Sequence, residues 1–280
     1  MSNIKKLLED FKDALYSDNY PETCRIHLEV QNAIIKDPKI LEELHCAEYS
    51  SFIKEQNYMS LCLNYIQSED WKLVKRKNNI TVESRGSGNE FFTRCTVLID
   101  ADIIPTLSVL SEIDLVTSWV DVLKEVEILH EPSKLKKLTK YHFWFPWPLS
   151  DRQCLISFNA IPMPDRRAMM ITMETPERND YYGNQLPVST SREVMMRIKL
   201  GCLYSEQIGD NKTKIIFVVS ADGNIRFLPS WLVNYGTKTI MYYMMDALRK
   251  KIMNIRGSIY EERIHQKADY YDMMRKTIFA

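Results

Sequence analysis

The sequence has little glycine, no excess of either charge and no long apolar run. Glycine supplies only 8 of its 280 residues, and 37 basic residues are matched by 37 acidic ones. Because a nucleic-acid partner normally requires a basic excess to neutralise phosphates, we expect none here. No segment approaches the roughly 20 consecutive apolar residues of a membrane-spanning helix. Residues 1–15 carry charges throughout, which argues against a secretion signal.

Motifs for catalysis and metal binding are also missing. The five histidines form no His-Glu-x-x-His pattern and no paired metal spacing, and there is no Gly-x-Ser-x-Gly and no phosphate-binding glycine loop. We therefore expect no metal and no cofactor. The scattered cysteines form no Cys-x-x-Cys pair, which predicts reduced thiols in the cytosol. They are Cys24, Cys46, Cys62, Cys95, Cys154 and Cys202.

The residues that are present are those of a packed globular protein, with 45% hydrophobic, 26% charged and 11% aromatic positions. Methionine (14) and tyrosine (15) are plentiful. Methionine adapts to irregular apolar surroundings, and tyrosine joins an apolar body to a polar tip. Both would suit a cavity for an apolar ligand, but an ordinary methionine-rich core explains them as well. Composition alone favours the ordinary core.

The first third of the chain has the periodicity of helices. Ile4, Leu8, Phe11 and Leu15 fall on one apolar stripe, and Tyr20-Pro21 interrupts it. A second helix is predicted over 22–36, and further helix up to residue 66. We expect residues 1–45 to form a helical extension that would offer a docking surface to a protein partner.

Strands dominate from residue 71 onward. Residues 71–85 predict a hairpin with its turn at Lys77-Asn78-Asn79. In 193–204, apolar residues from Met196 to Tyr204 alternate with Arg197 and Lys199, which predicts one half-buried face. The other expected strands are 91–99, 122–129, 138–145, 153–161, 168–174 and 212–220, with a short helix over 104–112 and a long helix from about 229 to 253. This order is α+β, and a curved antiparallel sheet around one long helix can enclose a ligand cavity.

Two segments resemble motifs of the StAR-related lipid transfer (START) family. Residues 145–152, Phe-Pro-Trp-Pro-Leu-Ser-Asp-Arg, are similar to the turn that links two central strands in that family. Residues 222–234 resemble its glycine turn and Pro-x-Trp-Leu-x-Asn helix start, nearest to the phosphatidylcholine-transfer group. The resemblance covers residues 46–253 and implies a helix-grip fold that holds one lipid. Residues 254–280 are expected to be a solvated helical tail.

The resemblance also implies where the protein would touch a membrane. In ceramide-transfer relatives, aromatic residues on two loops insert into the bilayer, and the matching positions are Trp147 and Phe227. An aromatic side chain between two prolines is held outward by a rigid turn, and tryptophan is favoured at the membrane interface. The alternative is that Trp147 packs on the surface of its own domain.

The lipid-binding residues that we expect lie on the strands and on the long helix. They are Tyr141, Phe143, Arg152, Cys154, Phe158, Met196, Ile198, Leu200, Phe217 and Tyr235. Val116 stands where phosphatidylcholine-transfer relatives have a phosphate-binding Arg, and two aromatic members of their choline cage are missing. Phe158 replaces the Arg of the sterol-binding pair. Neither phosphatidylcholine nor cholesterol is therefore the expected cargo. We interpret Arg152 as structural first and as a headgroup contact second.

These expectations favour a cytoplasmic lipid carrier that associates transiently with membranes. One alternative is a ligand sensor or cyclase-like enzyme of the same fold, but an enzyme would need a buried acid or base facing the ligand, and the predicted lining has almost none. Another alternative is a lipid-regulated adaptor, in which residues 1–45 bind a protein.

Overall fold

The computed structural model describes residues 2–44, 46–87, 91–145, 147, 149–177, 180–181, 184–187, 194–224 and 230–280. Its helices are α1 (Ser2–Tyr16), α2 (Tyr20–Lys36), α3 (Ile40–Glu43), α4 (Ala47–Gln67), α5 (Ile103–Ser111), the short 3₁₀ helices η2 (Ile113–Ser118) and η3 (Pro164–Arg166), α6 (Ser230–Met253), α7 (Ile259–Gln266) and α8 (Ala268–Ile278). Within the described ranges no helix is both long and apolar enough to cross a membrane.

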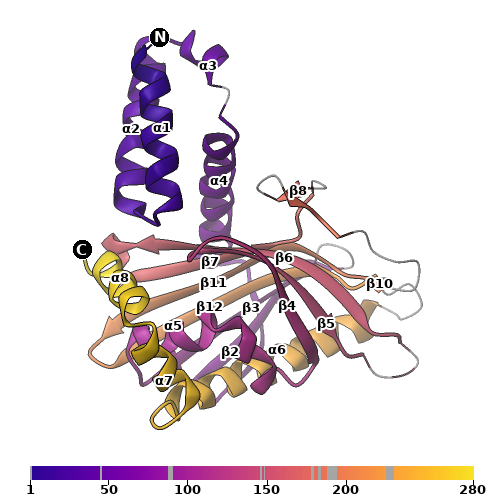
Figure 1. Cartoon of the computed structure of the whole chain (residues 1–280). Coiled ribbons are helices and arrows are strands. Elements are labelled where there is room, and N and C mark those ends of the chain that lie inside the picture. Colours follow the sequence, from indigo (N-terminus) through magenta and orange to yellow (C-terminus); the bar gives the residue numbers. More distant parts are fainter. Residues whose placement is uncertain are drawn as a thin grey trace.

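One large curved sheet organises the molecule (Figure 1). Its strands are β1 (Lys72–Lys77), β2 (Ile80–Arg85), β3 (Phe92–Ile99), β4 (Leu123–Ser133), β5 (Lys136–Phe143), β6 (Arg152–Met163), β7 (Ala168–Glu174), β10 (Val194–Met195), β11 (Arg197–Gly209) and β12 (Lys212–Asp222). They run in the order β1-β2-β3-β12-β11-β7-β6-β5-β4, with antiparallel neighbours, and β10 pairs with β6 in parallel. The short strands β8 (Asp180–Tyr181) and β9 (Asn184–Gln185) form a separate hairpin.

Local sequence accounts for the start of the sheet. The turn between β1 and β2 consists of Asn78 and Asn79, whose φ angles are 53° and 59°. A two-residue hairpin turn needs positive φ at both positions, and asparagine tolerates this conformation better than most residues. The hairpin predicted over 71–85 is confirmed.

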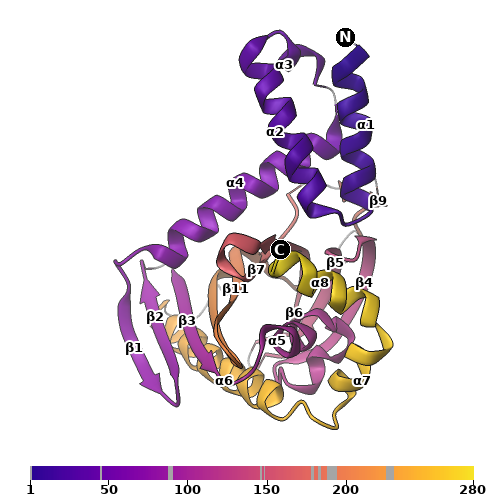
Figure 2. The same ribbon diagram turned by 90° about the vertical axis from the view of Figure 1, so that its left-hand side faces the viewer.

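The two faces of the sheet are covered by different helices (Figure 2). The outer face packs under α4, where Cys202 and Val218 are fully buried against partly buried α4 side chains such as Leu63. The inner face is crossed by α6, whose Met241 and Met245 pack against Val82 and its neighbours. The predicted α+β fold, a curved antiparallel sheet around a long C-terminal helix, is therefore confirmed.

Helices α1, α2 and the first half of α4 form a second core beside the sheet (Figures 1 and 2). The fully buried ring of Phe11 lies edge-on to Tyr49 and Phe52, with centroid distances of 5.1 and 5.3 Å. Because α4 contributes to this core and also to the outer face, the packing of the extension continues past residue 45.

The expectation that residues 254–280 are a solvated tail is wrong for one side of each helix. Tyr271, Met274 and Ile278 are almost completely buried against α5 and the sheet. The carboxylate of Glu112, 2% exposed, accepts hydrogen bonds from Tyr271 Oη at 2.8 Å and from Lys267 Nζ at 2.7 Å. The charges that suggested solvation thus include the partner of a buried carboxylate.

Candidate functional site

Strands β5 and β6 bring four of the expected residues together on the inner face. Tyr141 and Cys154 are direct cross-strand partners. The ring of Tyr141 lies 5.8 Å from that of Phe143, in a stacked arrangement, and 5.9 Å from that of Phe158. Because side chains alternate along each strand, these residues point to one side and form an apolar surface beneath α6.

Met196 and Ile198 also contribute to this apolar surface. Met196 N donates to Gln153 O at 2.7 Å, and Ile198 N donates to Thr175 Oγ1 at 2.9 Å. Both side chains pack into the same cluster as Tyr141. Phe217, on β12, lies in the adjoining inner-face cluster that contacts α6. The side chain of Tyr235 lies outside the described residues.

The expected place of Leu200 on this surface is wrong. The pairing of β11 with β12 shifts register between Ile198 and Leu200, so Leu200 packs on the outer face with Cys202. The hydroxyl of Tyr58 on α4 accepts from Gly201 N and donates to Met173 O, both at 2.9 Å. A bulge adds one residue to a strand and therefore reverses the direction of every side chain beyond it.

The sequence analysis did not predict several members of the inner-face cluster around Tyr141. Met173 on β7, Trp119 after η2 and Met244 on α6 all pack in it and are only partly buried. Strand alternation was a usable signal for Met173. No local signal pointed to Trp119, because its contacts come from strands and helices distant in the sequence.

The titratable groups of this cluster are held neutral. Burial raises the pKa of the fully buried Cys154 thiol to about 11, and burial also raises the pKa of the Tyr141 phenol. General acid–base catalysis needs a group that changes charge near neutral pH, and neither side chain provides one. No set of three or more His, Cys, Asp or Glu side chains in the described part of the chain is placed to hold a metal.

Arg152 lies at the end of the same face, one inward position beyond Cys154. Its Nε donates to Gly223 O at 2.8 Å, and its Nη1 donates to the carbonyl oxygen of Ser150 and, at 3.0 Å, to Ser150 Oγ. The guanidinium also lies over the ring of Phe145, 5.2 Å from its centroid. Arg152 therefore ties the loop before β6 to the segment after β12.

The loop before β6 presents tryptophan to solvent. Trp147 is 92% exposed and Trp144 is 47% exposed. The base of the loop is held by Asp151, which accepts from Lys124 Nζ at 2.5 Å and from Phe145 N at 3.3 Å. The hydrogen bond from Lys124 lowers the pKa of Asp151. Trp147 does not pack on its own domain, whereas Phe227 lies outside the described residues.

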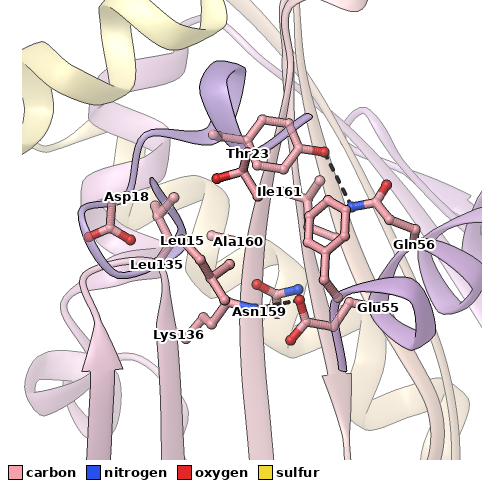
Figure 3. A pocket seen from close by; sticks show the side chains of 12 residues that line it. Leu15, Asp18, Thr23, Glu55, Gln56, Leu135, Lys136, Asn159, Ala160 and Ile161 are labelled. Atoms are coloured by element: carbon pink, nitrogen blue, oxygen red, sulfur yellow. Dashed lines mark hydrogen bonds and ion pairs between the residues drawn. The ribbon is translucent and has the colours of Figure 1, made fainter. Parts of the chain in front are cut away.

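A pocket between the helical extension and the sheet is too small for a ligand (Figure 3). It leaves about 20 Å³, enough for about one water molecule. Its walls are held by the ion pair of Glu55 with Lys136 and by a hydrogen bond from Gln56 to Tyr20 Oη. This pocket is part of the contact between the extension and the sheet.

No protein-family model and no curated protein matches the chain. Solved structures do. Human StAR-related lipid transfer protein 5 has a TM-score of 0.66 at 14% identity, over 74% of this chain and 99% of that one. Human STARD10 has a TM-score of 0.65 at 15% identity, over 80% and 88%. A STAR-related lipid transfer protein from Xanthomonas axonopodis has a TM-score of 0.55 at 20% identity, over 66% and 99%. At these identities the likeness is one of fold, and the chain shares its fold with these three solved structures.

Proposed function

We propose that this protein binds one lipid molecule between the inner face of the sheet and α6, and carries it between membranes. The fold supports this, since two of the similar solved structures are named as lipid transfer proteins. A carrier of this kind removes acyl chains from water, which is worth about 0.8 kcal/mol for each buried CH₂ group.

The observation that carries the proposal is the incomplete burial of large apolar side chains on the inner face. Phe143, Phe158, Met173, Met196 and Ile198 are only partly buried although they lie beneath a helix. Protein cores are normally packed to the density of organic crystals. Apolar side chains that stay partly accessible inside a fold are suited to contact an apolar ligand.

Membrane contact is proposed at Trp147 and Phe227. The support at Trp147 is its almost complete exposure at the tip of a loop that is anchored at its base. A tryptophan in this position can enter the interfacial layer of a bilayer without losing packing in the protein. The proposed location is the cytoplasm, which suits the six unpaired cysteine thiols.

A carrier is favoured over an enzyme of the same fold. The thiol and the phenol nearest to the proposed ligand keep their protons at neutral pH. Neither would act as a nucleophile or as a base there.

Native mass spectrometry after incubation with mixed-lipid vesicles tests the proposal. We expect one lipid per chain, and apoprotein alone would overturn it. Met196→Trp, which fills the inner surface, should abolish the complex while the protein stays folded. Ile208→Trp adds the same side chain at a position that is 41% exposed, and it should retain the lipid.

A lipid-regulated adaptor is the second candidate. The observation in its favour is that Leu28, Ile35 and Leu41 on the helical extension are 58%, 78% and 59% exposed. Deletion of residues 1–45 removes all three. Unchanged lipid transfer together with loss of a bound protein would favour the adaptor.

A further inference from the structure

The positive charge of Arg152 is buried, and no carboxylate among the described residues forms an ion pair with it. The residue is 4% exposed, and the hydrogen bonds of its guanidinium among the described residues go to carbonyl oxygens and to one serine hydroxyl. The adjacent carboxylate, Asp151, is paired with Lys124 and with His142 Nε2 at 3.2 Å. Removal of a charge from water is costly unless an opposite charge compensates it.

Arg94 shows how the same fold treats an arginine that is purely structural. It also donates to two carbonyl oxygens, those of Ile66 at 3.0 Å and Ser68 at 2.9 Å, and it lies over the ring of Trp71. Its Nε, however, binds the carboxylate of Glu83 at 2.8 Å. Arg94 on the outer face therefore has an ion pair, whereas Arg152 on the inner face has none within the part of the chain that the structure describes.

Arg152 also has N–H groups that make no hydrogen bond to the described residues. Its Nε and Nη1 make all of its hydrogen bonds within the described part of the chain, so the two N–H groups of Nη2 remain available there. A guanidinium binds phosphate or carboxylate oxygens strongly, because the hydrogen bonds are charge-assisted. Burial of the side chain lowers the pKa of Arg152, yet an arginine stays charged at any physiological pH.

Because of the position of Arg152, the proposed binding site has an apolar end and a positively charged end. Along β6, Phe158, Ile156 and Cys154 supply the apolar part of the inner face, and Arg152 follows at the end next to the exposed Trp147 loop. A molecule lying along the strand would meet apolar side chains first and a cation last.

We propose that Arg152 binds an anionic headgroup, so that the ligand is an amphiphile with a phosphate or carboxylate group beside the Trp147 loop. This assignment rests on the proposed lipid binding and adds the charge and the orientation of the ligand. The phosphate or carboxylate supplies the opposite charge that the described residues do not provide to Arg152.

The test is a competition between headgroups on the full chain. The protein is incubated with vesicles that contain equimolar phosphatidylglycerol and diacylglycerol with identical acyl chains, separated from them, and the retained lipids are quantified by mass spectrometry. Diacylglycerol lacks the phosphate, so we expect at least about tenfold more phosphatidylglycerol than diacylglycerol, which is the size of one charge-assisted hydrogen bond. The ratio is read on folded, re-isolated protein, so it does not depend on how much of a variant folds.

Two variants and one control complete the test. Arg152→Gln should bring the ratio close to one, while Arg152→Lys, which keeps the charge, should retain part of the preference. Arg94→Gln removes a comparable set of hydrogen bonds to carbonyl oxygens and should leave the ratio unchanged. An equal ratio in the unaltered protein and in Arg152→Gln overturns the assignment.

A further arm separates a lipid headgroup from a free anion. Inorganic phosphate that binds the unaltered protein but not Arg152→Gln, without any headgroup preference, would assign the site to a free anion and overturn the lipid orientation. If neither the unaltered protein nor any variant retains lipid, the proposed lipid binding is overturned. If all variants retain both lipids in equal proportion, lipid binding stands and only the role of Arg152 fails.

Discussion

The two faces of the sheet are built from the same strands but differ in how completely their side chains are packed and their charges paired. On the outer face α4 completes a closed core, in which Cys202 and Val218 are fully buried and Arg94 is paired with Glu83. On the inner face, the part beneath α6 that contains Val82 is closed as well, but around β5 and β6 large apolar side chains stay partly accessible, and Arg152 has no ion pair with a carboxylate of the described residues. We interpret the outer face as one that stabilises the fold and the β5–β6 part of the inner face as the one that is completed by a ligand.

The largest expected effect concerns a buried charge that is paired. Glu112→Ala should lower the free energy of unfolding by about 3–5 kcal/mol, because it removes two charge-assisted hydrogen bonds, each worth about 1.5–3 kcal/mol, and leaves the hydroxyl of the buried Tyr271 without this acceptor. Denaturant titration measures this. Asp114→Ala is the control: this carboxylate is 48% exposed, and its pair with Arg263 should be worth less than about 1 kcal/mol. Equal losses in both variants would contradict the role given to Glu112.

The comparison of the two faces can be tested within one strand. Met170 and Met173 both lie on β7, but Met170 is fully buried on the outer face and Met173 is partly buried on the inner face. Met170→Ala should cost about 3 kcal/mol, since it leaves a cavity in a closed core. Met173→Ala should cost about 1 kcal/mol in unfolding experiments and should weaken lipid retention. The reverse order would break the comparison.

A smaller effect follows from the Cys154 thiol. Its pKa is raised from 9.0 to about 11 by burial, so the folded state favours the protonated form. This contribution is fully present below pH 9 and is lost as the pH rises to 11, by at most about 1.4 kcal/mol for each pH unit. The stability of Cys154→Ala should therefore fall less steeply between pH 9 and pH 11 than that of the unaltered protein. Parallel curves would show that the thiol does not titrate in this window.

The smallest effect on stability is expected at Trp147. Its side chain is 92% exposed, so Trp147→Ala should change the free energy of unfolding by less than about 0.5 kcal/mol. It should nevertheless reduce binding to vesicles, measured by co-sedimentation. A variant that binds vesicles normally would remove Trp147 from the proposed membrane contact.

Much of the architecture was predictable because it depends on local patterns. The Asn78-Asn79 turn, the strand alternation that groups Tyr141, Phe143, Cys154 and Phe158, and the long helix after residue 229 each follow from residues close in the chain. A strand has a period of two and a helix a period of 3.6, so the apolar pattern indicates both the element and its buried side.

The sequence by itself determined the order of helices and strands, the balance of charge and the apolar face of each regular segment. Only the tertiary structure decided that Leu200 faces α4, that Glu112 draws the last helices into the core, and that Arg94 has an ion pair while Arg152 has none among the residues described. The physical reason is distance along the chain. Periodicity records neighbours within one element, whereas a bulge bridged by Tyr58 or a charge paired across the fold depends on residues more than a hundred positions away.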